Sequence, residues 1–189
     1  MQIYYIYSME NLASILENNP SVKTKSYRKG EIIQHSGELN AHRYYVKKGI
    51  LRSYIIDSKG KEHIFSFAPE GWIVGDIESL EYDQPGQLFI DCLEDSEVMI
   101  FDQDIFTIAS FSNQEITEYT HLLYRRMGIL QRRVLMLMSA PAIDRYQYFL
   151  KTYPELPNRI PQRMIAAFLG ITPQALSTLR SKMTFLEEP

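Results

Sequence analysis

The sequence holds a single cysteine, Cys92, among its 189 residues. One thiol cannot form an internal disulfide, nor can it alone hold an iron–sulfur cluster or a structural zinc ion. We therefore expect Cys92 to be a small buried residue on a strand. The 4 histidines, His35, His42, His63 and His121, are dispersed and lack the paired spacing of a metal site. We predict neither a metal nor another cofactor.

Long apolar runs are also missing, and the N-terminus lacks the basic start and apolar core of a secretion signal. The 9 prolines and 9 glycines are scattered, which argues against a collagen-like or low-complexity region. These absences predict a cytoplasmic protein with no membrane partner.

Net charge is low at −3, but it is unevenly distributed along the chain. Residues 1–113 carry 10 Lys and Arg against 17 Asp and Glu, a balance of −7. Residues 114–189 carry 10 against 6, a balance of +4. This asymmetry favours an acidic domain joined to a module that approaches phosphate.

Residues 159–183 contain two short amphipathic runs separated by a break at residues 169–173. Gly170 can end the first helix with a positive φ, Thr172 can cap the second, and Pro173 fits its first position. A small residue, a glycine four positions later and apolar residues six and nine beyond it are typical of a DNA-binding helix-turn-helix. The alternative is a pair of core helices in an unrelated all-α domain.

The helix-turn-helix interpretation places polar side chains on the outer face of the second helix, where they can read base edges or hold phosphates. The DNA-binding candidates are Gln162, Arg163, Thr172, Gln174, Ser177, Thr178, Arg180, Ser181 and Lys182.

Residues 22–101 contain short runs of Tyr, Ile, Val and Phe separated by glycine-containing turns, a pattern typical of an antiparallel sandwich or barrel. We predict strands over 43–47, 50–56 and 62–67, with a hairpin at Lys59-Gly60. A short helix with Leu12, Ile15 and Leu16 on one face should precede them.

A long helix is predicted over residues 114–139, which contain no proline. Its apolar residues repeat at alternating spacings of four and three, a heptad seam that predicts a parallel homodimer. The seam comprises Ile116, Thr120, Leu123, Met127, Leu130, Val134 and Leu137. A second stripe, Tyr119, Leu122, Ile129 and Met136, should pack on the rest of the chain, and the four arginines at 125, 126, 132 and 133 should be solvated. A hinge at 139–141, a helix over 142–153 and a loop over 154–157 should follow.

The order of the turn motifs resembles the Crp/Fnr family of bacterial transcription regulators. These motifs are Lys29-Gly30-Glu31, Gly37-Glu38, Tyr45-Val46 with Gly49, and Glu70-Gly71 with Gly75-Asp76. The resemblance implies an α+β fold with an N-terminal cyclic-nucleotide-binding-like β-roll, an antiparallel double-stranded β-helix. It also implies a long dimerisation helix and a C-terminal helix-turn-helix domain with its wing short or absent. Little sequence follows residue 183, so either the wing is missing or the chain is truncated. The corresponding domains are 1–113, 114–139 and 140–189.

In cyclic-nucleotide-binding members a Gly-Glu pair meets the ribose, and a downstream arginine grips the phosphate. Here Gly75-Asp76 takes the place of the first pair, but no Arg or Lys occurs between Gly75 and Asp102. A desolvated phosphate would lack a counter-charge, so we predict no binding of cAMP or cGMP. The residues of the corresponding effector pocket are Gly75, Asp76, Ile77, Glu78, Gln87 and Leu88. The effector is another small molecule, or there is none.

The leading functional hypothesis is a DNA-binding transcription regulator that binds a palindromic site as a homodimer, with double-stranded DNA and RNA polymerase as partners. The alternative is a ligand-binding or protein-interaction dimer whose degenerate helix-turn-helix no longer binds DNA. Thr178 and Pro173 favour it, because family members often present an arginine and a polar residue at these positions. A cupin-type enzyme is disfavoured, because His35, Glu38 and His42 do not supply a cupin's metal ligands.

Overall fold

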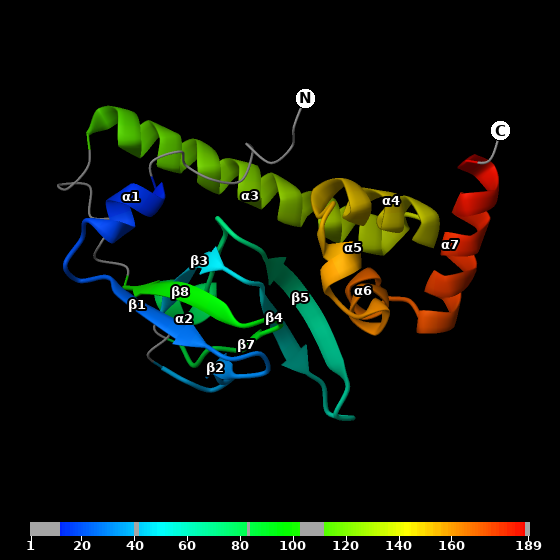
Figure 1. Ribbon diagram of the computed structural model, residues 1–189, viewed down its shortest axis with the longest axis horizontal. Helices are drawn as coiled ribbons and strands as arrows, with labels where there is room; N and C mark the ends of the chain where they lie inside the picture. Colours follow the sequence, from blue (N-terminus) through cyan, green and yellow to red (C-terminus); the bar gives the residue numbers. More distant parts are fainter. Residues whose placement is uncertain (1–11, 40–41, 83, 103–111, 188–189) are drawn as a thin grey trace. The chain divides into compact units, whose positions relative to one another are not determined.

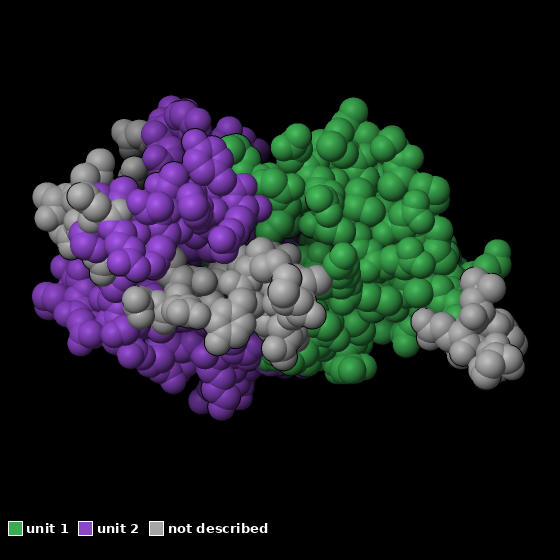
Figure 2. Space-filling view, turned by 90° about the horizontal axis from the view of Figure 1, so that it is seen from above, with its two compact units in different colours: residues 1, 126–189 green, residues 2–125 purple. Residues whose placement is uncertain are grey.

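The computed structural model describes residues 12–39, 42–82, 84–102 and 112–187 (Figure 1). The chain divides into two compact units, residues 2–125 and residues 126–189 (Figure 2). Among the described residues, no helix is both long enough and apolar enough to cross a membrane.

The first unit is built on two four-stranded antiparallel sheets, counted over the described residues. One sheet has the order β1 (Lys23–Tyr27), β8 (Ser96–Phe101), β3 (Arg43–Lys48), β6 (Ile73–Val74). The other has the order β2 (Ile32–Gln34), β7 (Phe89–Cys92), β4 (Leu51–Ile56), β5 (Glu62–Ala68). Neighbouring strands are often distant in sequence, as in a β-roll. The predicted strands 43–47, 50–56 and 62–67 each differ from the observed β3, β4 and β5 by one residue at one end.

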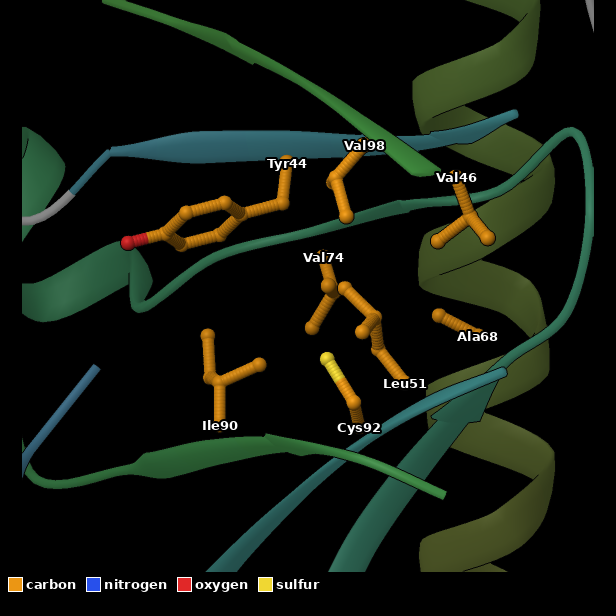
Figure 3. Close-up of a cluster of buried hydrophobic side chains, with 8 residues drawn as sticks. All are labelled: Tyr44, Val46, Leu51, Ala68, Val74, Ile90, Cys92 and Val98. Atoms are coloured by element: carbon orange, nitrogen blue, oxygen red, sulfur yellow. The ribbon is translucent and has the colours of Figure 1, made fainter. Parts of the chain in front are cut away.

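Alternate residues of both sheets point inward and form the core of the roll, because side chains along a strand alternate between its two faces. Figure 3 shows side chains from both sheets directed toward one another. The cluster comprises Tyr44, Val46, Leu51, Ala68, Val74, Ile90, Cys92 and Val98. Cys92 is buried on β7, which confirms the prediction for this residue.

The opposite face of the β1-β8-β3-β6 sheet is covered by helices. Leu12 and Leu16 of α1 (Leu12–Glu17) pack with three residues of that sheet and with Leu122 of α3 (Asn113–Ser139). The sheet residues are Tyr45, Met99 and Phe101. The ammonium group of Lys47 lies 2.9 Å from Glu17 and 3.3 Å from Glu97, and so ties α1 to the sheet.

The second unit contains the end of α3 and four further helices, counted over the described residues. They are α4 (Ala142–Thr152), α5 (Leu156–Arg159), α6 (Gln162–Leu169) and α7 (Pro173–Glu187). Phe149 is fully buried, and its ring centroid lies 5.5 Å from that of Tyr153 and 5.6 Å from that of Phe168. The predicted loop 154–157 is partly wrong, because α5 begins at Leu156. The α+β fold itself is confirmed.

Candidate nucleic-acid interface and effector pocket

The turn after α6 has the geometry that its glycine predicts. Gly170 adopts φ 68° and ψ 32°, in the left-handed region. The N–H of Gly170 donates to the carbonyl of Ala167 at 3.2 Å, and the N–H of Ile171 donates to that of Ala166 at 3.0 Å. These two bonds form a Schellman motif, which satisfies carbonyls that a helix end would leave open. The direction of the chain after α6 is therefore fixed by local hydrogen bonding.

The start of α7 is defined by Thr172 and Pro173. The hydroxyl oxygen of Thr172 accepts a hydrogen bond from the N–H of Ala175 at 3.2 Å, as an N-cap does. Pro173 is the first residue of the helix. Leu176 is buried beside a set of α6 residues that is also buried, namely Ile165, Ala166, Phe168 and Leu169. Helix, turn and helix thus form as predicted.

Eight of the nine predicted DNA-binding side chains lie on residues open to solvent at least in part. They are Arg163, Thr172, Gln174, Ser177, Thr178, Arg180, Ser181 and Lys182. The ninth, Gln162, is half-buried, and its side-chain amide donates to the carbonyl of Pro157 at 3.4 Å. The outer face of α7 is thus polar and accessible, while Gln162 is partly engaged inside the unit.

Two hydroxyls on that face are turned back toward their own helix. Thr178 Oγ1 donates to the carbonyl of Gln174 at 3.1 Å, and Ser181 Oγ donates to that of Ser177 at 3.2 Å. Such bonds to the residue four positions earlier are common for hydroxyl side chains in helices. Each oxygen keeps acceptor capacity, so both groups can still accept a bond from a base edge.

Two arginines from neighbouring helices hold the end of α6. Arg145 of α4 donates from Nη1 to the carbonyl of Leu169 at 2.7 Å. Arg133 of α3 donates from Nη2 to the carbonyl of Phe168 at 3.4 Å, and its guanidinium carbon lies 4.0 Å from the centroid of the Phe168 ring. Positive charge is favourable at a helix C-terminus, where carbonyl dipoles point outward. The prediction that Arg133 is solvated is wrong, and burial lowers the pKa of its guanidinium below the ordinary arginine value.

The predicted effector pocket centres on Asp76, which is only 3% exposed. Asp76 precedes the short helix α2 (Ile77–Tyr82), and its Oδ1 accepts from the N–H of Glu78 at 3.1 Å and of Ser79 at 3.5 Å. Its Oδ2 accepts from the N–H of Gln87 at 2.6 Å and of Leu88 at 2.7 Å. One carboxylate therefore joins the start of α2 to the segment before β7.

The other predicted pocket residues lie around this carboxylate. The side-chain amide of Gln87 hydrogen-bonds the carboxylate of Glu78. Ile77 is 60% exposed, and its side chain adds no enclosure. A Cβ at Gly75 would lie 3.1 Å from the carbonyl oxygen of His42, so this position has little space for a side chain. The structure thus brings the predicted pocket residues together, but chiefly around groups of their own chain.

Two buried arginines of the roll, Arg43 and Arg52, form ion pairs with carboxylates of the chain. Arg52 is buried and makes two 2.8 Å hydrogen bonds to Asp91 and one of 2.6 Å to Glu62. Burial disfavours its charge, but these bonds to carboxylates raise the pKa of Arg52 above its ordinary value. Arg43 donates to Glu81 at 2.6 Å. Arg52 is thus fully engaged by carboxylates, whereas Nη1 of Arg43 is buried and has no hydrogen-bond partner among the described residues.

Comparisons with known proteins agree with this architecture. Residues 24–110 match the model of the cyclic nucleotide-binding domain family. FixK2 from Bradyrhizobium japonicum is 23% identical, with a TM-score of 0.68, over 87% of this chain and 85% of its own. A transcriptional regulator of the CRP/FNR family from Thermus thermophilus is 16% identical, with a TM-score of 0.68, over 87% of each chain. The chain has the Crp/Fnr regulator fold.

A third structure with this fold is CLP of Xanthomonas campestris, described as a c-di-GMP responsive global regulator. It is 15% identical, with a TM-score of 0.69, over 91% of each chain. No curated protein sequence matches the chain. The resemblance to the Crp/Fnr family is thus confirmed at the level of the fold.

The predicted seam on α3 is largely open to solvent. Five of its large apolar residues are between 42% and 57% exposed, namely Leu123, Met127, Leu130, Val134 and Leu137. Thr120 is exposed and Ile116 is half-buried. Leu137 also borders a hollow beside Phe168 and Leu169.

Metal chemistry finds little support in the part of the chain that the structure describes, where no group of three His, Cys, Asp or Glu residues could hold an ion. His42 lies 2.6 Å from Asp102, and His63 lies 2.8 Å from Asp57.

The sequence did not predict the role of the two arginines at the end of α6, Arg133 and Arg145. The residues that they contact, Phe168 and Leu169, lie more than 20 positions away, so no local sequence pattern predicts these contacts.

Proposed function

We propose that the chain is a transcription regulator of the Crp/Fnr type, which binds a palindromic DNA site as a homodimer. The observation that carries the proposal is the exposed polar face of α7, held at a defined angle by the Gly170 turn and a buried apolar face. This is how helix-turn-helix proteins present a recognition helix to the major groove. Gln174 is exposed near the N-terminus of α7, where a glutamine can make paired hydrogen bonds to adenine.

The exposed seam of α3 supports the homodimer. A heptad stripe of Leu, Met and Val that is about half exposed in a single chain costs free energy in water, and a second copy of the same helix can cover it. A two-fold axis along this helix would relate the two recognition helices, so the DNA half-sites should lie about 34 Å apart. In this proposal residues 1–113 sense an effector, residues 114–139 form the dimer and residues 140–189 bind DNA.

The cyclic nucleotides cAMP and cGMP are not the expected effectors of the roll. CLP is described as responsive to c-di-GMP, so this fold is not restricted to cAMP. No Lys or Arg occurs between Gly75 and Asp102, where the resemblance places the arginine that grips the cyclic phosphate, and this argues against cAMP and cGMP. The regulator would therefore respond to another small molecule or to none, and would act on transcription through DNA and RNA polymerase.

The decisive experiment is selection of bound sequences from a random duplex library at low salt, repeated at high salt. We expect an enriched two-fold palindrome with half-sites one turn apart, and weaker recovery at high salt because phosphate contacts release counterions. Gln174→Ala should relax the preference at one position of each half-site. Gln147→Ala, on the exposed side of α4, is the matched control and should leave the selected sequence unchanged.

A second candidate is an effector-binding or protein-interaction dimer that no longer binds DNA. Two observations favour it: the back-bonded Thr178 at a reading position, and the small number of cations on α7, Arg180 and Lys182. It predicts a folded dimer with no enriched sequence even at low salt. That outcome would contradict the regulator proposal and indicate that the roll carries the function.

A further inference from the structure

The carboxylate of Asp76 sits where four backbone N–H groups converge. Two belong to the first turn of α2, at Glu78 and Ser79, and two to the segment before β7, at Gln87 and Leu88. The two bonds from that segment are short, at 2.6 and 2.7 Å, as charge-assisted hydrogen bonds are. Backbone N–H groups that converge on one buried point form an anion-binding concavity.

The segment before β7 is shaped to bring its N–H groups to this point. The N–H of Gly86 donates to the carbonyl of Glu38 at 2.9 Å, and the N–H of Gly37 donates back to the carbonyl of Gly86 at 2.7 Å. A Cβ at Gly86 would lie only 3.1 Å from Asp76 Oδ2. Glycine at position 86 therefore permits the close approach that Asp76 needs.

An external anion would meet an unfavourable environment at the same point. The donors are already saturated by a buried carboxylate, and Glu78 adds a second negative charge beside it. A phosphate or carboxylate ligand would have to displace the Asp76 carboxylate from these donors, and residues 75–102 contain no Lys or Arg that could offset the added charge.

We propose that Asp76 is a built-in anion, which occupies the N–H donors between α2 and β7 so that the roll takes no anionic ligand there. This proposal concerns the β-roll alone and holds whether or not the protein binds DNA. A second consequence rests on the proposed function: the affinity for DNA does not depend on an effector that carries a phosphate at this site.

The first test uses the wild-type chain and amide NMR spectra. The N–H resonances of Gln87 and Leu88 should not move when inorganic phosphate or cAMP is added at constant ionic strength. Saturable shifts confined to Glu78, Ser79, Gln87 and Leu88 would show that an external anion takes these donors, and would overturn the proposal.

The second test removes the internal anion. Asp76→Ala should lower the midpoint of thermal unfolding by about 5 °C or more, because it leaves buried N–H groups without acceptors. Phosphate or acetate, but not an equal ionic strength of chloride, should restore part of that loss as it fills the vacated point. Asp57→Ala is the matched control, since Asp57 also accepts from two backbone N–H groups, those of Lys59 and Lys61, but on an open hairpin. No recovery should occur there.

A variant Asp76→Ala that is as stable as wild type, or that does not respond to either anion, contradicts the proposal. If this variant does not fold, Asp76→Asn keeps the shape and one acceptor oxygen but removes the charge, so its unfolding midpoint should fall below that of wild type without recovery by phosphate; a midpoint equal to that of wild type would contradict the proposal. These readouts need no DNA. A failed library selection therefore leaves the anion result standing, and a bound phosphate in wild type leaves the regulator proposal standing.

Discussion

Replacement of Arg145 by methionine tests how the helix-turn-helix is held. Methionine keeps most of the apolar stem but removes the guanidinium that donates to the Leu169 carbonyl at 2.7 Å. A hydrogen bond from a charged group contributes about 1.5–3 kcal/mol, and a cation at a helix C-terminus contributes about 0.3–1 kcal/mol. Because Arg145 is half-buried, we take a value near the middle of the hydrogen-bond range and expect the free energy of unfolding to fall by about 2 kcal/mol.

The assay is urea unfolding followed by circular dichroism, with Lys151→Met as the control. Lys151 lies on the same helix, is exposed, and loses the same charge, so its replacement should change stability by no more than about 0.5 kcal/mol. Binding to the selected DNA should fall further in the Arg145 variant than its lost stability explains, because the α6–α7 turn keeps its local hydrogen bonds but loses its attachment to α4. Equal unfolding curves for the two variants would refute the reasoning that the Arg145–Leu169 bond stabilises this turn.

Three further predictions address the seam, the thiol and a turn. Leu130→Glu should dissociate the dimer in analytical ultracentrifugation, whereas Arg132→Glu, exposed on the same helix, should not. Burial raises the pKa of Cys92 to about 11, so iodoacetamide at pH 8 should label it only in denaturant; the stability that its neutral form contributes is complete below pH 9 and is lost as pH rises toward 11. Gly49→Ala should cost about 2–4 kcal/mol, since its Cβ would lie 2.9 Å from the Asp95 carbonyl oxygen and closer still to Ser96 Oγ, whereas Gly30→Ala should cost only about 1 kcal/mol for its positive φ, and denaturant titration would detect the difference.

The elements set by local chemistry were predictable from the sequence. The helix-turn-helix depends on three neighbouring signals, Gly170, Thr172 and Pro173, and each of them determines backbone geometry within one or two residues. The strands could be predicted for a similar reason, since glycine-containing turns separate short runs rich in Tyr, Ile, Val and Phe. Predicted and observed ends differ by one residue for β3, β4 and β5, as expected where pairing with another strand decides the last hydrogen bond.

The hydrogen bonding of Asp76 could not be predicted from the sequence. Gly75-Asp76 marked the place, and the missing arginine predicted no cyclic nucleotide there. Whether the Asp76 carboxylate faces a ligand or its own chain depends on the N–H groups of Gln87 and Leu88. Backbone donors are present at every residue except proline, so they leave no signature in the sequence. Arg133 shows the same limit, because its partner Phe168 is 35 positions away.

The two apolar stripes of the long helix α3 differ in how far the chain itself buries them. The pattern of this helix predicted two apolar stripes, a heptad seam for a partner helix and a second stripe that packs on the rest of the chain. Leu122 is 4% exposed within the roll's helix-covered cluster, and Met136 of the same stripe borders Phe168 and Leu169 in the second unit. Leu123, one position after Leu122 and about 100° around the helix, is 49% exposed. Since the chain uses one stripe for its own packing, the other is left for a partner with the same heptad period, and the simplest such partner is a second copy of α3.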